Sequence, residues 1–214
     1  MIGFIGGTGP EGRGLALRFA LAGEMVLIGS RDEGRANEAA KSLAGDAPPG
    51  SVRGKANADV AHESDIVFIA VPYSAQRPTL EGLKGSLVGK LVVNVIAPLV
   101  FEKGRASAVR VDAGSAAEEA RDLLPESTIV AAFQNISAQK LLVPDQSLDT
   151  DVVVCADDSD AKQKVMALAE AISGVRAVDG GGLANARYVE GLTALLLNIN
   201  RIYKANSMIK IVGI

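Results

Sequence analysis

The stretch that decides the fold is IGFIGGTGPEGRGLALRFALAG, residues 2–23. It begins with the apolar run Ile2–Ile5, which is typical of a short buried strand. The apolar residues of 15–23 share one helical face, which predicts a helix there. Between them lies a glycine-rich loop with the pattern G-x-G-x-x-G. This pattern is specific only in context, and here the context is present: a strand before it, a helix after it, and a second apolar run, Met25–Ile28. The stretch therefore predicts a strand–loop–helix unit of a dinucleotide-binding domain.

The glycines of the loop, Gly7, Gly9 and Gly12, suit a phosphate ligand. A Cβ would hold the backbone away from a pyrophosphate, and the helix N-terminus offers free N–H groups to the anion. Pro10 fits an early helical position, where its fixed φ is favourable. The alternative is a tight turn without any ligand; we favour the ligand-binding interpretation.

The end of the second strand carries Ser30 and Arg31, and Arg35 follows one helical turn later. An acid at this place would accept hydrogen bonds from a ribose diol, as in NAD binding, and would repel a 2′-phosphate. A hydroxyl and two guanidinium groups instead offer donors and positive charge to that phosphate, so we predict NADP rather than NAD. Asp32 is interpreted as the cap of a helix over Glu33–Leu43. The alternative is a pair of exposed arginines that merely flank this helix.

The rest of the chain alternates apolar strand patterns with helical ones. Strands are expected over 64–72, 90–98, 128–137, 150–158 and 175–182, and helices over 114–124, which Ser115 caps, and about 160–173. We expect the unit 150–182 to extend the same sheet with parallel neighbours. The predicted fold is α/β, a Rossmann-type doubly wound, mostly parallel sheet in an NADP-binding domain (1–180). Residues 181–214 are predicted to form a small C-terminal helical domain that packs on the sheet domain and on a second subunit.

Composition excludes several classes of function. The net charge of −3 argues against nucleic acid and anionic membranes as partners, and no apolar run approaches the roughly 20 residues that span a bilayer. The single cysteine, Cys155, allows no intrachain disulfide and favours a cytoplasmic location. Neither Cys155 nor the single histidine, His62, has metal-ligand spacing or lies at a strand end. No acid–base pair is evident, so no catalytic residue and no metal are predicted; hydride exchange between two cofactors suits such a site.

Four stretches of the chain resemble the F420-dependent NADP oxidoreductases of methanogenic archaea and some bacteria. They are IGGTGPEGRGLALRFALAG, IGSRD, GSAAEEARDLLPESTIVAAFQNISA and GGLANARYVEGLTALLLNINR, and the resemblance covers essentially the whole chain in order. Members of this family pass a hydride between NADPH and the deazaflavin coenzyme F420, and they are commonly homodimers. The resemblance implies the same two cofactors and a homodimer here.

The resemblance also implies binding residues for each part of the two cofactors. It places the pyrophosphate at Thr8, Gly9, Pro10 and Glu11, and the 2′-phosphate at Ser30, Arg31 and Arg35. It places the nicotinamide at Val71, Pro72, Tyr73, Ala97, Leu99 and Ala138. It places the deazaflavin at Gln134, Ile136 and Met208.

Two other functions are also compatible with the sequence. One is an NADP-dependent reductase of an imine or a hydroxyacid, which needs a lysine, histidine or acid near the nicotinamide; the only candidates identified from the sequence are Lys204 and Lys210. The other is a non-enzymatic protein that senses NADP(H).

Overall fold

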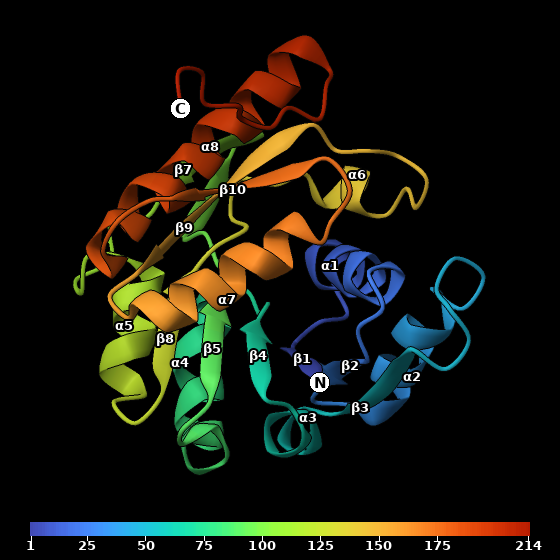
Figure 1. The fold of residues 1–214 in the computed structure, drawn as a ribbon. Helices are drawn as coiled ribbons and strands as arrows, with labels where there is room; N and C mark the ends of the chain where they lie inside the picture. The colour runs from blue at the N-terminus through green and yellow to red at the C-terminus, as the bar shows by residue number, and fades with distance from the viewer.

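The structure, a computed structural model that describes residues 1–214, is an eight-stranded sheet with helices on both faces (Figure 1). The strands of this sheet are β1 Ile2–Ile5, β2 Val26–Ser30, β3 Val52–Ala56, β4 Ile66–Ile69, β5 Leu91–Asn94, β8 Thr128–Ala131, β9 Thr150–Ala156 and β10 Val175–Asp179. The helices are α1 Pro10–Leu21, α2 Glu33–Lys41, α3 Asn57–Glu63, α4 Tyr73–Leu83, α5 Ala116–Leu123, α6 Ala138–Leu141, α7 Ser159–Glu170 and α8 Ala186–Tyr203. Short 3₁₀ turns occupy Lys84–Leu87 and Leu183–Asn185, and no helix combines the length and the apolar character that crossing a membrane requires.

The order of the strands creates the edge at which ligands bind in this class of fold. The order is β10-β9-β8-β5-β4-β1-β2-β3, and the six strands from β8 to β3 are parallel. The chain proceeds from β1 to β2 and β3 on one side and then returns to place β4 on the other side of β1. The carboxyl ends of β1 and β4 therefore flank a topological switch point, the usual ligand-binding position in an open α/β sheet.

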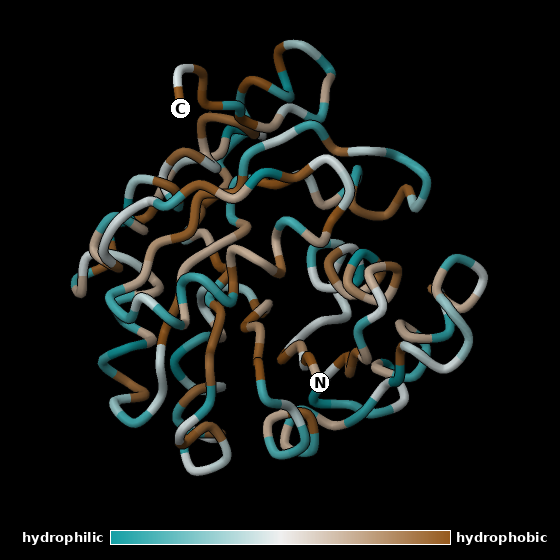
Figure 2. The backbone as a smooth tube through the Cα atoms, in the orientation of Figure 1, coloured by the Kyte–Doolittle hydropathy of each residue, from teal (hydrophilic) through white to brown (hydrophobic).

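The core lies on both faces of the sheet because adjacent residues of each strand point to opposite faces. Phe4 and Phe68 pack with Phe19 of α1 and with Phe133, at ring-centroid separations of 4.8–6.2 Å. On the opposite face, Ile5 and its neighbours pack against α3, α4, α5 and the first turns of α8. Figure 2 shows the same distribution, with hydrophobic segments along the central strands and hydrophilic ones at peripheral turns.

The fold class predicted from the sequence is confirmed, and so are two helix caps. The Asp32 carboxylate accepts a hydrogen bond from the Arg35 backbone N–H (3.2 Å), and Ser115 Oγ accepts one from the Glu118 N–H (3.0 Å). Each satisfies a backbone donor that has no partner within its helix. The carboxylate of Asp32 therefore serves the start of α2.

Two expectations about the fold are wrong in part, and one hairpin was not predicted. The strands β9 and β10 extend the sheet and are parallel to each other, but β9 runs antiparallel to β8. The region after β5 contains an unexpected antiparallel hairpin, β6 Leu99–Glu102 and β7 Arg105–Ala108. The C-terminal helix ends at Tyr203, and residues 204–214 form no regular element. This segment is held by β9, since the Ile209 carbonyl accepts hydrogen bonds from the Asp151 N–H and from Thr150 Oγ1, both at 2.9 Å.

Candidate active site

Three adjoining cavities follow the carboxyl edge of the sheet. The loop cavity, about 640 Å³, lies at the switch point between the glycine loop, the end of β2 and the segment 70–79. The middle cavity, about 210 Å³, lies between the segment 70–73, the segment 95–97 after β5, and α8. The helix cavity, about 360 Å³, lies between the segment 134–139, α8 and the start of the C-terminal segment. Glu11 lines all three cavities, while Gln134 and Thr193 line both the middle and the helix cavity.

The glycine loop is shaped for close approach of a ligand. A Cβ on Gly12 would lie 2.5 Å from Gly7 Cα, and a Cβ on Gly7 would lie 2.6 Å from Phe4 Cβ, so internal packing requires these two glycines. Gly9 is different, because a Cβ there would meet no atom within 4 Å, and its φ of −74° suits any residue. Nothing within the chain accounts for a glycine at position 9. A pyrophosphate that approaches the N-terminus of α1 does account for it, so the loop fits the predicted ligand.

The end of β2 presents the predicted phosphate-binding residues to the loop cavity. Ser30, Arg31 and Arg35 all line it, together with Asp32. Ser30 is buried and its Oγ accepts a hydrogen bond from the Asp32 N–H at 3.2 Å, whereas both arginines are exposed and make no ion pair with an acid of the chain. With Asp32 serving as a cap, two free guanidinium groups remain at the mouth of this cavity, which suits a phosphate.

The structure distributes the remaining predicted residues over the three cavities. Thr8, Gly9, Pro10, Glu11 and Gly12 line the loop cavity, and Gly7 supports the loop from behind. Val71 and Pro72 line both the loop and the middle cavity, Tyr73, Ala97 and Gln134 line the middle cavity, and Ile136 and Ala138 line the helix cavity. Leu99 begins β6 and Met208 packs, half-buried, on the core; neither lines these cavities. Ala138, predicted beside the nicotinamide, lies at the cavity that holds the predicted deazaflavin residues.

The segment after β8 joins the middle and helix cavities through a fixed backbone. Phe133 adopts a φ of +73°, which is unusual for a bulky residue, and its ring is buried among the phenylalanines of the core. Gln134 is then held by two hydrogen bonds: its Nε2 donates to the Asn94 carbonyl (2.9 Å), and its own carbonyl accepts from Thr193 Oγ1 (2.8 Å). Its Oε1 is buried without a hydrogen-bond partner. A buried acceptor without a partner suits a hydrogen-bond donor on a ligand.

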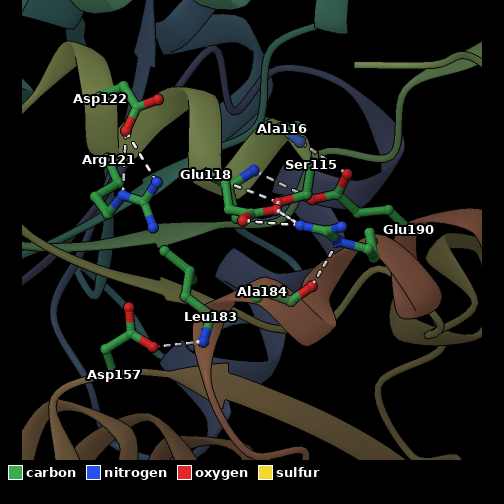
Figure 3. Close-up of polar contacts among 11 residues, drawn as sticks. Ser115, Ala116, Glu118, Arg121, Asp122, Asp157, Leu183, Ala184 and Glu190 are labelled. Atoms are coloured by element: carbon green, nitrogen blue, oxygen red, sulfur yellow. Dashed lines mark hydrogen bonds and ion pairs between the residues drawn. The ribbon is translucent and has the colours of Figure 1, made fainter. Parts of the chain in front are cut away.

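Helix α8 is anchored to the sheet domain by a buried carboxylate. Glu190 accepts hydrogen bonds from the backbone N–H groups of Ala116 (2.8 Å) and Ala117 (3.1 Å) at the start of α5 (Figure 3). Burial raises the pKa of Glu190 to about 7, while these two N–H groups act in the opposite direction. The anchor lies one turn from Thr193, so it fixes the part of α8 that lines the cavities.

The sequence did not indicate the structural role of Arg18 or the central position of Glu11. Arg18, on α1, is buried, and its guanidinium donates hydrogen bonds to five backbone carbonyls of the segment 140–146. Glu11 was predicted only as a contact of the pyrophosphate, although it is a carboxyl group at the junction of all three cavities. Glu11 and Tyr73, both predicted to contact the cofactor, line the middle cavity together.

Comparisons with known proteins identify the family of this chain. Residues 1–98 match the family described as NADP oxidoreductase coenzyme F420-dependent. The F420-dependent NADP reductase of Methanothermobacter thermautotrophicus is 43% identical over 205 residues, which cover 93% of this chain and 88% of that protein. The chain belongs to the F420-dependent NADP reductase family.

Other members of the F420-dependent NADP reductase family match over a similar extent. The reductase of Methanocaldococcus jannaschii is 39% identical over 95% of this chain and 94% of its own. A crystal structure assigned to an F420 dependent NADP-reductase from Arthrobacter sp. FB24 superposes with a TM-score of 0.82 at 27% identity, over 99% of both chains. The family assigned by resemblance from the sequence is therefore confirmed.

The residues considered for other chemistry lie away from the three cavities. Lys204 and Lys210 are exposed, and Lys210 forms an ion pair with Asp149. His62 lies on α3, and Cys155 is buried in β9, where burial raises the pKa of its thiol to about 11. The two lysines proposed for an imine or hydroxyacid reductase thus have no place beside the middle cavity.

Proposed function

We propose that this protein transfers a hydride directly between NADP(H) and coenzyme F420. The main support for this proposal is that three adjoining cavities lie at the switch point of the sheet. The chain that forms them belongs to the F420-dependent NADP reductase family. Gln134 and Thr193 line both the middle and the helix cavity, so groups bound in these two cavities would be neighbours. A hydride transfer needs such proximity, because the two reacting rings must stack a few ångströms apart.

In this proposal each cavity binds one part of the two substrates. The glycine loop, Ser30, Arg31 and Arg35 bind the phosphates of NADP in the loop cavity, and the nicotinamide enters the middle cavity beside Val71 and Pro72. The deazaflavin enters the helix cavity beside Gln134 and Ile136. When both substrates are bound, C4 of the reduced nicotinamide supplies the hydride that C5 of the deazaflavin accepts. The chain positions the rings and excludes water, and the apolar residues Ile136, Leu196 and Leu197 suit the second task.

An isotope experiment tests the direct transfer. NADPH with deuterium on the transferring face of C4 is mixed with oxidised F420 and the enzyme in ordinary water, and the reaction is followed at the deazaflavin absorption band. We expect reduced F420 to carry the deuterium quantitatively. Loss of the label to solvent would contradict direct transfer, and absence of any F420 reduction would contradict the proposed function.

Replacement of Gly9 by alanine tests the binding of NADP at the glycine loop. The added methyl group meets no atom of the chain, so the thermal unfolding temperature should stay close to that of the wild type. The same methyl group occupies the space in which the pyrophosphate would approach, and loss of one charge-assisted hydrogen bond, worth about 1.5–3 kcal/mol, should weaken NADPH binding about ten- to a hundredfold. Fluorescence titration with NADPH measures this effect.

Gly12→Ala is the matched control for this substitution. Its methyl group would lie 2.5 Å from Gly7 Cα, so this variant should lose stability as well as affinity. Unchanged NADPH affinity in a folded Gly9→Ala variant would show that the glycine loop does not bind NADPH.

We also propose that the protein is a homodimer with a small C-terminal unit, residues 181–214, at its interface. Large apolar side chains gather on α8 and the adjacent hairpin and are exposed in the single chain: Tyr188 by 71%, Leu195 by 55%, Ile202 by 72% and Phe101 by 64%. Exposed apolar surface of this kind is typical of protein–protein interfaces. Light scattering coupled to gel filtration would measure the mass of a dimer, and a monomeric mass at micromolar concentration would contradict it.

A further inference from the structure

Glu11 occupies the point at which the three cavities meet. It lies in the first turn of α1, two residues after Gly9, and it lines the loop, middle and helix cavities. Its Oε1 is buried and has no hydrogen-bond partner. A buried carboxylate oxygen without a donor is unfavourable, whereas a protonated carboxyl carries no charge and can itself donate a hydrogen bond.

No charged group of the chain offsets the burial of Glu11. The loop cavity is also lined by Arg31, Asp32 and Arg35. In the middle cavity, Tyr73 is the only other titratable residue. In the helix cavity, neither the segment 134–139 nor α8 nor the C-terminal segment contributes an ionisable side chain. Lys140 of α6 and Arg13 of α1, whose Nη1 donates to Ser42 Oγ, lie outside the cavity lining. Burial dominates and raises the pKa of Glu11 to about 8.

The proposed binding of NADP adds negative charge beside this carboxyl group. Glu11 follows the loop that would hold the pyrophosphate, and an ionised carboxylate there would repel it. We infer that Glu11 binds the dinucleotide in its protonated form and acts as a positioning residue, donating a hydrogen bond to the bound substrate at the junction of the cavities. This inference rests on the proposed function, since it assumes that NADP(H) occupies the loop and middle cavities.

The inference makes NADPH binding depend on pH in a defined direction. Below the pKa of Glu11 in the free enzyme the group is already protonated, so affinity is constant. Above it, binding must be accompanied by uptake of a proton, and affinity falls by up to tenfold per pH unit. With the pKa at about 8, the Kd for NADPH should increase about tenfold between pH 7 and pH 9.

Isothermal titration calorimetry with NADPH at pH 7, 8 and 9 tests this inference. Each titration is made in two buffers of different ionisation enthalpy, which gives the number of protons taken up on binding. For the wild type we expect uptake of roughly half a proton at pH 8 and close to one at pH 9. For Glu11→Gln we expect no uptake and a Kd that changes less than twofold over this range. Glu38→Gln, which removes an exposed acid of α2, should behave as the wild type does.

The outcomes separate the inference from the proposed function. A wild-type Kd that stays constant from pH 7 to pH 9 overturns the inference whether or not Glu11→Gln folds. So does proton uptake that persists unchanged in Glu11→Gln. Failure of the wild type to bind NADPH at pH 7 contradicts the proposed function itself, because the inference predicts undiminished affinity at that pH.

Discussion

Replacement of Arg31 by alanine should weaken NADPH binding about ten- to a hundredfold and leave NADH binding nearly unchanged. Arg31 lines the loop cavity beside Ser30 and Arg35, is exposed, and forms no ion pair with an acid of the chain. Its guanidinium is thus free to pair with the 2′-phosphate that distinguishes NADPH from NADH. One charge-assisted hydrogen bond is worth about 1.5–3 kcal/mol, which corresponds to this range of affinity.

The comparison of the two dinucleotides is the internal control of this experiment, and Arg53→Ala is the external one. Arg53 is an exposed arginine of β3 that lines none of the three cavities. Its removal changes the net charge equally and should leave both affinities close to those of the wild type. An equal loss of NADH and NADPH affinity in Arg31→Ala would reject the phosphate role of Arg31.

Asp32 explains how an acid can stand beside a phosphate site. Its carboxylate accepts a hydrogen bond from the first turn of α2, close to the positive end of that helix dipole. This hydrogen bond engages its charge within the chain, while the neighbouring arginines remain free. The sequence alone allowed this interpretation because capping is a local pattern, confined to a few adjacent residues.

The predictions that the structure confirms rest on such local patterns. The strand–loop–helix unit of residues 2–23, the cap of α2 and the alternation of apolar strands with helices are all encoded within windows of ten to twenty residues. The parallel arrangement follows because strands joined through helices normally lie parallel in one sheet. Fold class and the position of the loop cavity could therefore be derived before the structure was known.

The features that the sequence did not predict depend on contacts between distant residues. The direction of β9 relative to β8 is set by the path of the chain from 132 to 149, which contains only one short helix. The C-terminal segment is held by hydrogen bonds to β9, about sixty residues earlier in the chain. The importance of Glu11 likewise arises from three cavities that the glycine loop, the segments after β2, β4, β5 and β8, and helix α8 form. Periodicity and spacing carry no information about such contacts.

Arg18 shows how a residue of a recognised motif can serve another part of the site. It lies in the stretch LALRFALAG, whose apolar residues alone predict the helix. In the structure it joins α1 to the segment that follows α6. Its Nε donates to the Leu141 carbonyl at 2.8 Å, and its Nη2 donates to those of Val143 at 2.5 Å and Gln146 at 2.8 Å. This segment directly follows Ile136 and Ala138 in the chain, and both of these residues line the helix cavity.

Replacement of Arg18 by methionine should therefore destabilise the protein and impair the use of F420. Methionine keeps the helix propensity and much of the side-chain length, but it removes every donor to these carbonyls. Each buried acceptor left without a donor costs about 1–3 kcal/mol, so we expect the free energy of unfolding to fall by at least about 3 kcal/mol. For a chain of this size such a loss corresponds to a decrease of roughly 6–12 °C in the thermal unfolding temperature. Urea and thermal unfolding measure both quantities.

The kinetic consequence of the same substitution distinguishes the two substrate sites. Loosening of the segment 136–146 should raise the KM for F420 several-fold. The Kd for NADPH should change less, because Arg18 lies in the last turn of α1, whereas the glycine loop precedes its first turn. Arg121→Met is the matched control: this exposed arginine of α5 pairs only with its neighbour Asp122, and its removal should alter stability little. If Arg18→Met unfolds like the wild type, the five hydrogen bonds do not hold the segment. If it raises the Kd for NADPH as much as the KM for F420, the helix cavity is not the part of the site that Arg18 supports.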